Sequence, residues 1–118
     1  MSYSEILLDH ALNPRNIGEF TSNENYLEGR VGSEASGNII QMRIKINDNK
    51  IEDVRIKIYG NPATIAAASW IGEEIKGKTV SEALAINSQN IAKALELPAV
   101  KMHCALLAED VVKASLMA

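Results

Sequence analysis

Apolar and polar residues alternate strictly in the middle of this chain. The alternation begins at Ile40, breaks at the stretch Asn47-Asp48-Asn49-Lys50, and resumes until Ile58. A period of two places successive side chains on opposite faces of a strand, and Asn and Asp favour turns. The pattern therefore predicts an antiparallel hairpin with one buried face and one face in water. The apolar positions of the buried face are Ile40, Met42, Ile44, Ile46, Val54, Ile56 and Ile58.

The N-terminal part of the chain predicts a short helix and then irregular structure. Ser2 and Glu5 have the spacing of a capping box. The helix that follows is expected to end at Asn13-Pro14, because the residue before proline avoids the helical conformation. The polar, glycine-rich stretch 16–37 predicts a loop or a set of short edge strands.

Helices are expected after residue 60, where the period of two ends. Asn61 is a good N-cap and Pro62 suits a first helical turn, so a helix is predicted up to Ile75. The capping box Thr79–Glu82 then opens a shorter helix that runs to about Ile86.

Two more helices complete the predicted fold. One is expected over residues 87–95, and Pro98 starts the last one. The inner side of this last helix is expected to carry Val100, Leu107, Val111 and Leu116. The order of elements predicts an α+β fold for residues 1–118 as one domain, a small antiparallel β-sheet with helices packed on one face.

Composition narrows the classes of function. The 118 residues carry a net charge of −3, which argues against a protein that coats nucleic-acid phosphates or an anionic membrane. One Trp, three Tyr and one Phe are too few for a base-stacking surface. No apolar run approaches the roughly 20 residues of a membrane span. We therefore expect a cytoplasmic protein that binds neither nucleic acid nor membrane.

The single cysteine, Cys104, follows directly after a histidine, His103. One cysteine excludes an internal disulfide. In a reducing compartment, such a pair is a candidate metal ligand set or nucleophile. The alternative is that Cys104 is an inert buried thiol, packed as a small apolar residue against the sheet.

A series of separated segments carries a resemblance to known proteins. The segments are Asp9-His10, Asn13-Pro14-Arg15-Asn16-Ile17-Gly18, Val31-Gly32, Ile51-Glu52-Asp53-Val54-Arg55, Tyr59-Gly60, Leu97-Pro98-Ala99-Val100-Lys101-Met102-His103-Cys104 and Leu106-Leu107-Ala108-Glu109-Asp110. In their order and spacing they resemble the IscU/NifU-type family of iron–sulfur cluster scaffolds. The resemblance implies the same sheet-and-helix fold that the periodicity predicts.

The resemblance also implies a metal site at one end of the molecule. In this family, a cysteine in an Ala-Cys-Gly-Asp loop, a cysteine after Tyr-Gly and a His-Cys pair converge. They receive sulfur from a cysteine desulfurase and assemble a cluster with iron. In this chain His103 and Cys104 match the pair. The loop cysteine, its aspartate and the cysteine after Tyr-Gly are replaced by Ser36, Asn38 and Asn61, respectively.

These replacements remove good ligands. Iron–sulfur clusters and structural zinc take thiolate or imidazole, usually four per tetrahedral site. A serine hydroxyl and a neutral amide are poor substitutes, so one subunit supplies only His103 and Cys104. Two subunits facing each other would supply four, which makes a homodimer that bridges a cluster one hypothesis.

Each replacement also has a structural interpretation. Asn61 before Pro62 is expected to cap a helix. Ser36 is expected to satisfy backbone donors of its own loop, and Asn38 to keep a side-chain acceptor for that loop. His103 is, in this interpretation, only a polar residue near a helix start.

The segment Leu97, Pro98, Ala99, Val100 and Lys101 is similar to the Leu-Pro-Pro-Val-Lys segment through which such scaffolds bind an Hsp70-type chaperone. Ala99 in place of the second proline loosens the extended conformation that consecutive prolines favour. The alternative is that Pro98 only begins a helix whose first apolar residues pack inward.

The resemblance therefore implies an iron–sulfur cluster assembly scaffold, not an enzyme, that binds iron, zinc or a dimer-bridged cluster through His103 and Cys104. Two alternatives stay open. One is a metal-free paralogue that binds the desulfurase or the chaperone as a regulator. The other is a sulfur relay in which Cys104 accepts persulfide sulfur while His103 favours the thiolate.

Overall fold

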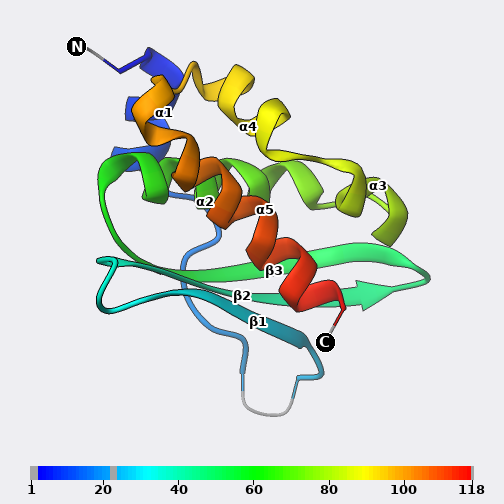
Figure 1. The fold of residues 1–118 in the computed structure, drawn as a ribbon. Coiled ribbons are helices and arrows are strands. Elements are labelled where there is room, and N and C mark those ends of the chain that lie inside the picture. Colours follow the sequence, from blue (N-terminus) through cyan, green and yellow to red (C-terminus); the bar gives the residue numbers. More distant parts are fainter. Residues whose placement is uncertain (1–2, 22–23, 118) are drawn as a thin grey trace.

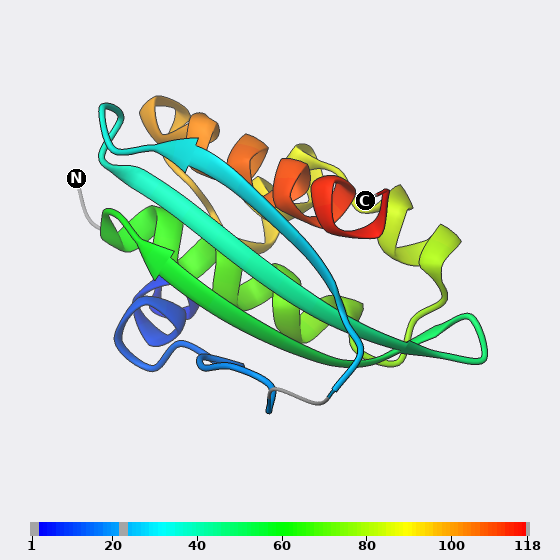
Figure 2. The same cartoon turned by 90° about the horizontal axis from the view of Figure 1, so that it is seen from below.

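The computed structural model describes residues 3–21 and 24–117. A three-stranded antiparallel sheet, in the order β1-β2-β3, lies beneath five α-helices that all pack on one side of it (Figure 1). Viewed from below, the opposite face of the sheet is not covered by any of these helices (Figure 2). This arrangement confirms the predicted α+β fold. The elements are α1 (Glu5–Leu12), β1 (Leu27–Ser33), β2 (Asn38–Asn47), β3 (Lys50–Tyr59), α2 (Pro62–Ile75), α3 (Val80–Ala85), α4 (Ser88–Leu95), the 3₁₀ turn η1 (Ala99–Lys101) and α5 (Met102–Leu116).

The predicted hairpin is formed by β2 and β3. Its register pairs Met42 with Ile56 and Ile44 with Val54, and all four side chains are completely buried beneath the helices. Ile46 departs from the prediction, because its side chain is 38% exposed. The pairing register shifts between Lys45 and Ile46, and such an irregularity breaks the alternation of faces.

The stretch 16–37 contains one edge strand, β1, which pairs with β2 from Leu27↔Ile44 to Ser33↔Asn38. Helix α5 packs directly over β1. The contact is so close at Gly29 that a Cβ atom there would lie 2.4 Å from the backbone nitrogen of Ser115. Any side chain at Gly29 would therefore push the helix and the strand apart.

Local caps start the helices, as predicted for α2 and α3. Asn61 caps α2, the Thr79–Glu82 capping box opens α3, and Asn87 caps α4. Helix α1 differs, because Ser4 is its N-cap and accepts a hydrogen bond from the backbone of Leu7. The predicted cap residue Ser2 lies outside the described residues.

The start of the last helix also differs from the prediction. Pro98 is followed by the separate 3₁₀ turn η1 before α5 begins at Met102. The tighter winding of a 3₁₀ turn changes the direction of its side chains. As a result, Val100 is 70% exposed, whereas Val111 is buried on the inner face as expected.

The two longest helices form the layer that contacts the sheet. Helix α2 packs over β3, and α5 packs over β1 and β2. Helices α1 and α4 lie against α2 and α5, respectively. Every helix in the described part of the chain is too short or too polar to span a bilayer.

Candidate functional site

The three segments expected to carry ligands meet at one end of the sheet. They are the β1–β2 turn, the junction of β3 with α2, and the first turn of α5. Hydrogen bonds link side chains from all three segments, and we call this group of side chains the Asn38 network. Its members are Asn38, Asn61, Thr64 and Cys104.

Asn38 is the centre of this network. Its side chain is 7% exposed, and its Oδ1 atom accepts hydrogen bonds from three donors. Thr64 Oγ1 donates at 2.8 Å, and the backbone and side-chain nitrogens of Asn61 donate at 3.2 and 3.3 Å. The prediction that Asn38 serves its own loop is therefore incomplete. Its carbonyl oxygen binds the start of α2, and only its Nδ2 contacts the loop, at 3.4 Å from the Ser36 carbonyl oxygen.

Gly60 makes room for this contact. A Cβ atom at Gly60 would lie 2.5 Å from Asn38 Oδ1 and 3.2 Å from the side chain of Thr64. The Asn38 side chain can reach the start of α2 only because residue 60 has no side chain.

Asn61 and Ser36 have the structural roles predicted for them. Asn61 Oδ1 accepts a 3.0 Å hydrogen bond from the backbone nitrogen of Thr64 and so caps α2. Ser36 is exposed and stays within its turn. Its hydroxyl donates to the Ser33 carbonyl oxygen at 2.9 Å and accepts from the Asn38 backbone nitrogen at 3.3 Å.

Cys104 is completely buried at the start of α5, whereas His103 beside it is exposed. The Cys104 sulfur lies 3.2 Å from Thr64 Oγ1, 3.5 Å from His103 Nε2 and 3.7 Å from Asn61 Oδ1. Its polar neighbours thus come from its own helix and from the first turn of α2. The expectation of a small apolar residue facing the sheet is confirmed for burial, but the sulfur also has polar contacts with His103 of α5 and with Thr64 and Asn61 at the start of α2.

This donor set does not fit an iron–sulfur cluster or a zinc ion held by one subunit. The described ranges 3–21 and 24–117 contain no group of three or more His, Cys, Asp or Glu side chains placed to hold a metal. Ser36, Asn38 and Asn61 offer hydroxyl and amide groups that are already hydrogen-bonded. A tetrahedral site needs about four strong donors, and this end of the molecule presents two, one of which is enclosed.

Comparison with known proteins places the chain in a family. The family model described as the NifU-like N terminal domain matches residues 2–118. The chain belongs to this family. It is 49% identical to the iron–sulfur cluster assembly scaffold protein IscU of Escherichia coli K12, over 98% of this chain and 92% of that protein. It is 48% identical to the IscU of Haemophilus influenzae, over 98% of this chain and 94% of the relative.

Solved structures share the fold of this NifU-like domain. One is a protein of Fervidobacterium islandicum assigned as an iron–sulfur cluster assembly scaffold for the SUF system. It matches with a TM-score of 0.78 at 21% identity, over 97% of this chain and 96% of that one. The N-terminal part of a NifU-like protein of Brucella abortus matches with a TM-score of 0.72 at 15% identity, over 97% and 91% of the two chains. At these identities the likeness supports the fold alone.

The segment that resembles a chaperone-binding motif lies next to the Cys104 end of this NifU-like domain. Leu97 is half-buried against the core, and the next residues form η1. Ala99 and Val100 are exposed, Val100 by 70%. The alternative interpretation, in which the first apolar residues after Pro98 pack inward, is wrong for Val100.

Thr64 is the member of the Asn38 network that sequence reasoning missed. Its side chain is completely buried, although the residue lies in the alanine-rich first turn of α2. The available signal was its position three residues after the N-cap Asn61. At that position the backbone nitrogen is bonded to the cap, and a polar side chain lies beside it.

A second polar cluster joins α1 to α2. His10 is 3% exposed, and its Nδ1 lies 2.8 Å from Ser69 Oγ. Burial lowers the pKa of His10, and the positive charge of Arg15 acts in the same direction against the opposing carboxylates of Glu73 and Asp9. Arg15 binds Asp9 at 2.6 Å and holds the pKa of that exposed carboxyl below its ordinary value.

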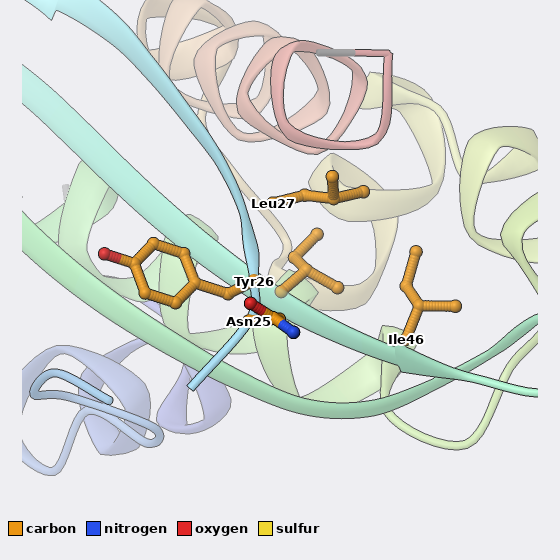
Figure 3. Close-up of a pocket in the computed structure, with 5 residues that line it drawn as sticks. Asn25, Tyr26, Leu27 and Ile46 are labelled. Atoms are coloured by element: carbon orange, nitrogen blue, oxygen red, sulfur yellow. The ribbon is translucent and has the colours of Figure 1, made fainter. Parts of the chain in front are cut away.

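A surface hollow of about 350 Å³ lies at the opposite end of the sheet from Cys104 (Figure 3). Leu27 and Ile46 line it on one side, whereas the ring of Tyr26 extends in another direction. Asn25 and Ile44 complete the lining. Among the residues that the structure describes, the lining of this hollow has no thiol, imidazole or carboxylate.

Proposed function

We propose that this NifU-like protein works in iron–sulfur cluster assembly as a scaffold-type subunit that binds the assembly proteins but does not hold a cluster with its own side chains. The relatives named as IscU support the link to cluster assembly. The donor set argues against a cluster held by one subunit. The proposal therefore takes the metal-free, partner-binding alternative in preference to ligation through His103 and Cys104.

One observation carries this choice. The positions at which the family pattern has two cysteines and an aspartate are all used by the fold itself. Ser36 closes a turn, Asn61 caps α2 and Asn38 accepts three hydrogen bonds. A metal ligand needs lone pairs that point into an open space, whereas the lone pairs of these three side chains point at hydrogen-bond donors of the protein.

Restoring the missing donors tests the proposal. The wild type and the triple variant Ser36→Cys, Asn38→Asp, Asn61→Cys would be incubated anaerobically with ferrous iron and sulfide and then desalted. We expect visible cluster absorption and bound iron only in the triple variant. Adding Cys104→Ala to the triple variant should lower both signals again, and circular dichroism verifies that each variant is folded.

A cluster retained by the wild type would overturn the metal-free proposal. Size-exclusion chromatography of that sample separates two cases. About two iron atoms on a dimer, lost in His103→Ala, would support a homodimer that bridges a cluster. The same iron on a monomer would mean that a single subunit supplies enough ligands.

The proposed partners are a cysteine desulfurase and an Hsp70-type chaperone. Exposure of Val100 beside the half-buried Leu97 supports chaperone binding, since a peptide-binding partner needs accessible apolar side chains. Affinity capture with each purified partner tests this, and failure to retain either one contradicts the proposal. Sulfur relay through Cys104 is less favoured, because the completely buried thiol must first leave its polar neighbours. A +32 Da adduct after incubation with desulfurase and cysteine would revive it.

A further inference from the structure

The face of the sheet that points away from the helices carries a set of cationic side chains (Figure 2). We call it the open face. Alternate residues of β2 and β3 are buried beneath the helices, so the residues between them point to the open face. The lysine and arginine side chains that the three strands place there are Arg30, Arg43, Lys45, Arg55 and Lys57.

The chain itself shows which side chains the open face binds. Between α1 and β1, residues 19–21 and 24–26 lie on this side of the sheet (Figure 1). The carboxylate of Glu19 binds Lys57 and lies 3.7 Å from Arg43. The carboxylate of Glu24 lies 2.7 Å from the Lys45 ammonium. Acidic side chains of this segment therefore pair with the cations of the face.

The ring of Phe20 adds cation–π contacts. Its centroid lies 5.0 Å from the Arg55 guanidinium carbon and 5.4 Å from Lys45 Nζ. Phe20 is only 9% exposed, so the ring is packed onto the open face and does not extend into water. The open face thus binds a segment in which an acidic residue directly precedes an aromatic one.

The next rows of the open face, toward the β1–β2 turn, are more accessible. The strand register places Arg30, Gln41 and Lys57 in one row across the sheet, and Ile39 beside Tyr59 in the next. Arg30 is exposed, and the side chains of Lys57 and Tyr59 are 51% and 69% exposed. A hollow of about 350 Å³ or slightly less, which we call the Tyr59 hollow, is lined by Arg30, Ile39, Gln41, Lys57, Ile58 and Tyr59.

The Tyr59 hollow has the same combination of cations and apolar surface as the rows that Glu19 and Phe20 cover. Among the ion pairs of the described residues, none involves Arg30. The nearest carboxylate on the other rows is Glu34, which lines a separate hollow with Ile39 and Tyr59. An anionic group is therefore favoured beside Arg30, and an apolar group beside Ile39 and Tyr59.

We propose that the Tyr59 hollow binds an extended acidic segment of a partner protein, with a carboxylate paired with Arg30 and Lys57. An aromatic side chain next to that carboxylate packs on Ile39 and Tyr59. The apolar part of the hollow favours such a peptide over the phosphates of a nucleic acid. The inference goes beyond the proposed function, because it concerns the open face and requires no metal, desulfurase or chaperone.

Fluorescence anisotropy with a labelled peptide tests the inference. The probe is a fluorescein-labelled peptide that repeats Gly-Glu-Phe-Thr, the sequence of residues 18–21. We expect saturable binding to the wild type at low ionic strength, and weaker binding as salt screens the exposed charges. A peptide that repeats Gly-Glu-Ser-Thr should bind more weakly, because it lacks the aromatic contact. A peptide that repeats Gly-Lys-Phe-Thr should not bind, because its charge is reversed.

Charge reversal in the hollow locates the binding. The double variant Arg30→Glu, Lys57→Glu should weaken binding of the Gly-Glu-Phe-Thr peptide about tenfold, because two attractive contacts become repulsive. The matched control is Lys50→Glu, Lys93→Glu, which reverses two exposed lysines at the hairpin turn and on α4. It changes the net charge by the same amount and should bind like the wild type. Circular dichroism verifies that both variants are folded.

Three outcomes would overturn the inference. The first is the absence of saturable binding of the Gly-Glu-Phe-Thr peptide by the wild type, a result that needs no variant to fold. The second is equal binding by the wild type and by Arg30→Glu, Lys57→Glu. The third is tighter binding of a fluorescein-labelled thymidine oligonucleotide than of the peptide, which would indicate a nucleic-acid surface. The assay contains neither iron nor sulfide, so its failure is distinct from a failure of the proposed function.

Discussion

Replacing Asn38 by alanine tests the network on which the site depends. The change removes the only side-chain oxygen that Thr64 Oγ1 and the Asn61 backbone nitrogen share as acceptor. The donors themselves stay in place. Thr64 is completely buried and Asn61 is half-buried, so water does not readily replace the lost acceptor. The lost stability then reflects donors without acceptors, together with a small cavity.

The size of the effect follows from those two donors. A buried donor left without an acceptor costs about 1–3 kcal/mol. The Asn61 side-chain nitrogen, the third donor to Asn38, belongs to a half-buried residue that water can reach. We therefore expect Asn38→Ala to lower the free energy of unfolding by about 2–4 kcal/mol, a large fraction of the roughly 5–15 kcal/mol of a typical domain.

Urea unfolding followed by circular dichroism measures this loss. With a slope of about 2 kcal/mol/M, the midpoint should fall by about 1–2 M. Asn38→Asp keeps an acceptor in the same place and loses only the long bond from Nδ2 to Ser36, so its loss should be about 1 kcal/mol. Asn25→Ala, at an exposed asparagine, is the matched control and should stay within about 0.5 kcal/mol of the wild type.

The reasoning fails if Asn38→Ala is as mild as Asn25→Ala, because the Asn38 oxygen would then not be the acceptor of buried donors. It also fails if Asn38→Asp is as damaging as Asn38→Ala. In that case the amide nitrogen, not the oxygen, would be the group that matters.

Three further changes probe other parts of the molecule. Gly29→Ala places a methyl group 2.4 Å from the Ser115 backbone nitrogen and should cost about 1–3 kcal/mol in thermal unfolding, so an unchanged Tm would contradict the close packing of α5 on β1. Burial lowers the pKa of His10, so the unfolded chain binds a proton there first and stability should decrease as pH falls below about 6.5. His10→Gln should flatten this decrease between pH 7 and pH 5, and His103→Gln should keep it. Val100→Asp should leave stability within about 0.5 kcal/mol but weaken capture by an Hsp70-type chaperone, and equal capture would remove Val100 from that surface.

The sequence allowed prediction of those elements whose signals are local. The alternation over 40–58 identified the hairpin, and caps such as Asn61 and the Thr79–Glu82 capping box identified helix starts, because each depends on residues a few positions apart. For strand β1 the sequence does not decide between a loop and edge strands, since its two glycines and its polar residues have no clear period. Its place depends on pairing with β2 and on the contact of Gly29 with α5, which are tertiary features.

The site shows the same division between local signals, which the sequence reveals, and tertiary contacts, which it does not. Family resemblance located the three converging segments, and the N-cap rule explained Asn61. The partners of Asn38 were not predictable, because Thr64 is 26 positions away and its link to Cys104 spans a further 40. Thr64 itself gave only a weak signal in an alanine-rich helical turn.

The Asn38 network also explains why the missing ligands cannot be regained one at a time. Cysteine at position 61 alone removes the cap of α2 and the side-chain donor to Asn38, yet still leaves Ser36 and Asn38 in place of ligands. Aspartate at position 38 alone puts a charge among donors that face a neutral amide, and Thr64 Oγ1 still lies 3.2 Å from the Cys104 sulfur. Each single change should therefore lower stability without creating a metal site, because a site needs several donors with unoccupied lone pairs at once. Only the combined replacement supplies several metal ligands at once. Metal binding by the single variant Asn61→Cys would refute this cooperative interpretation.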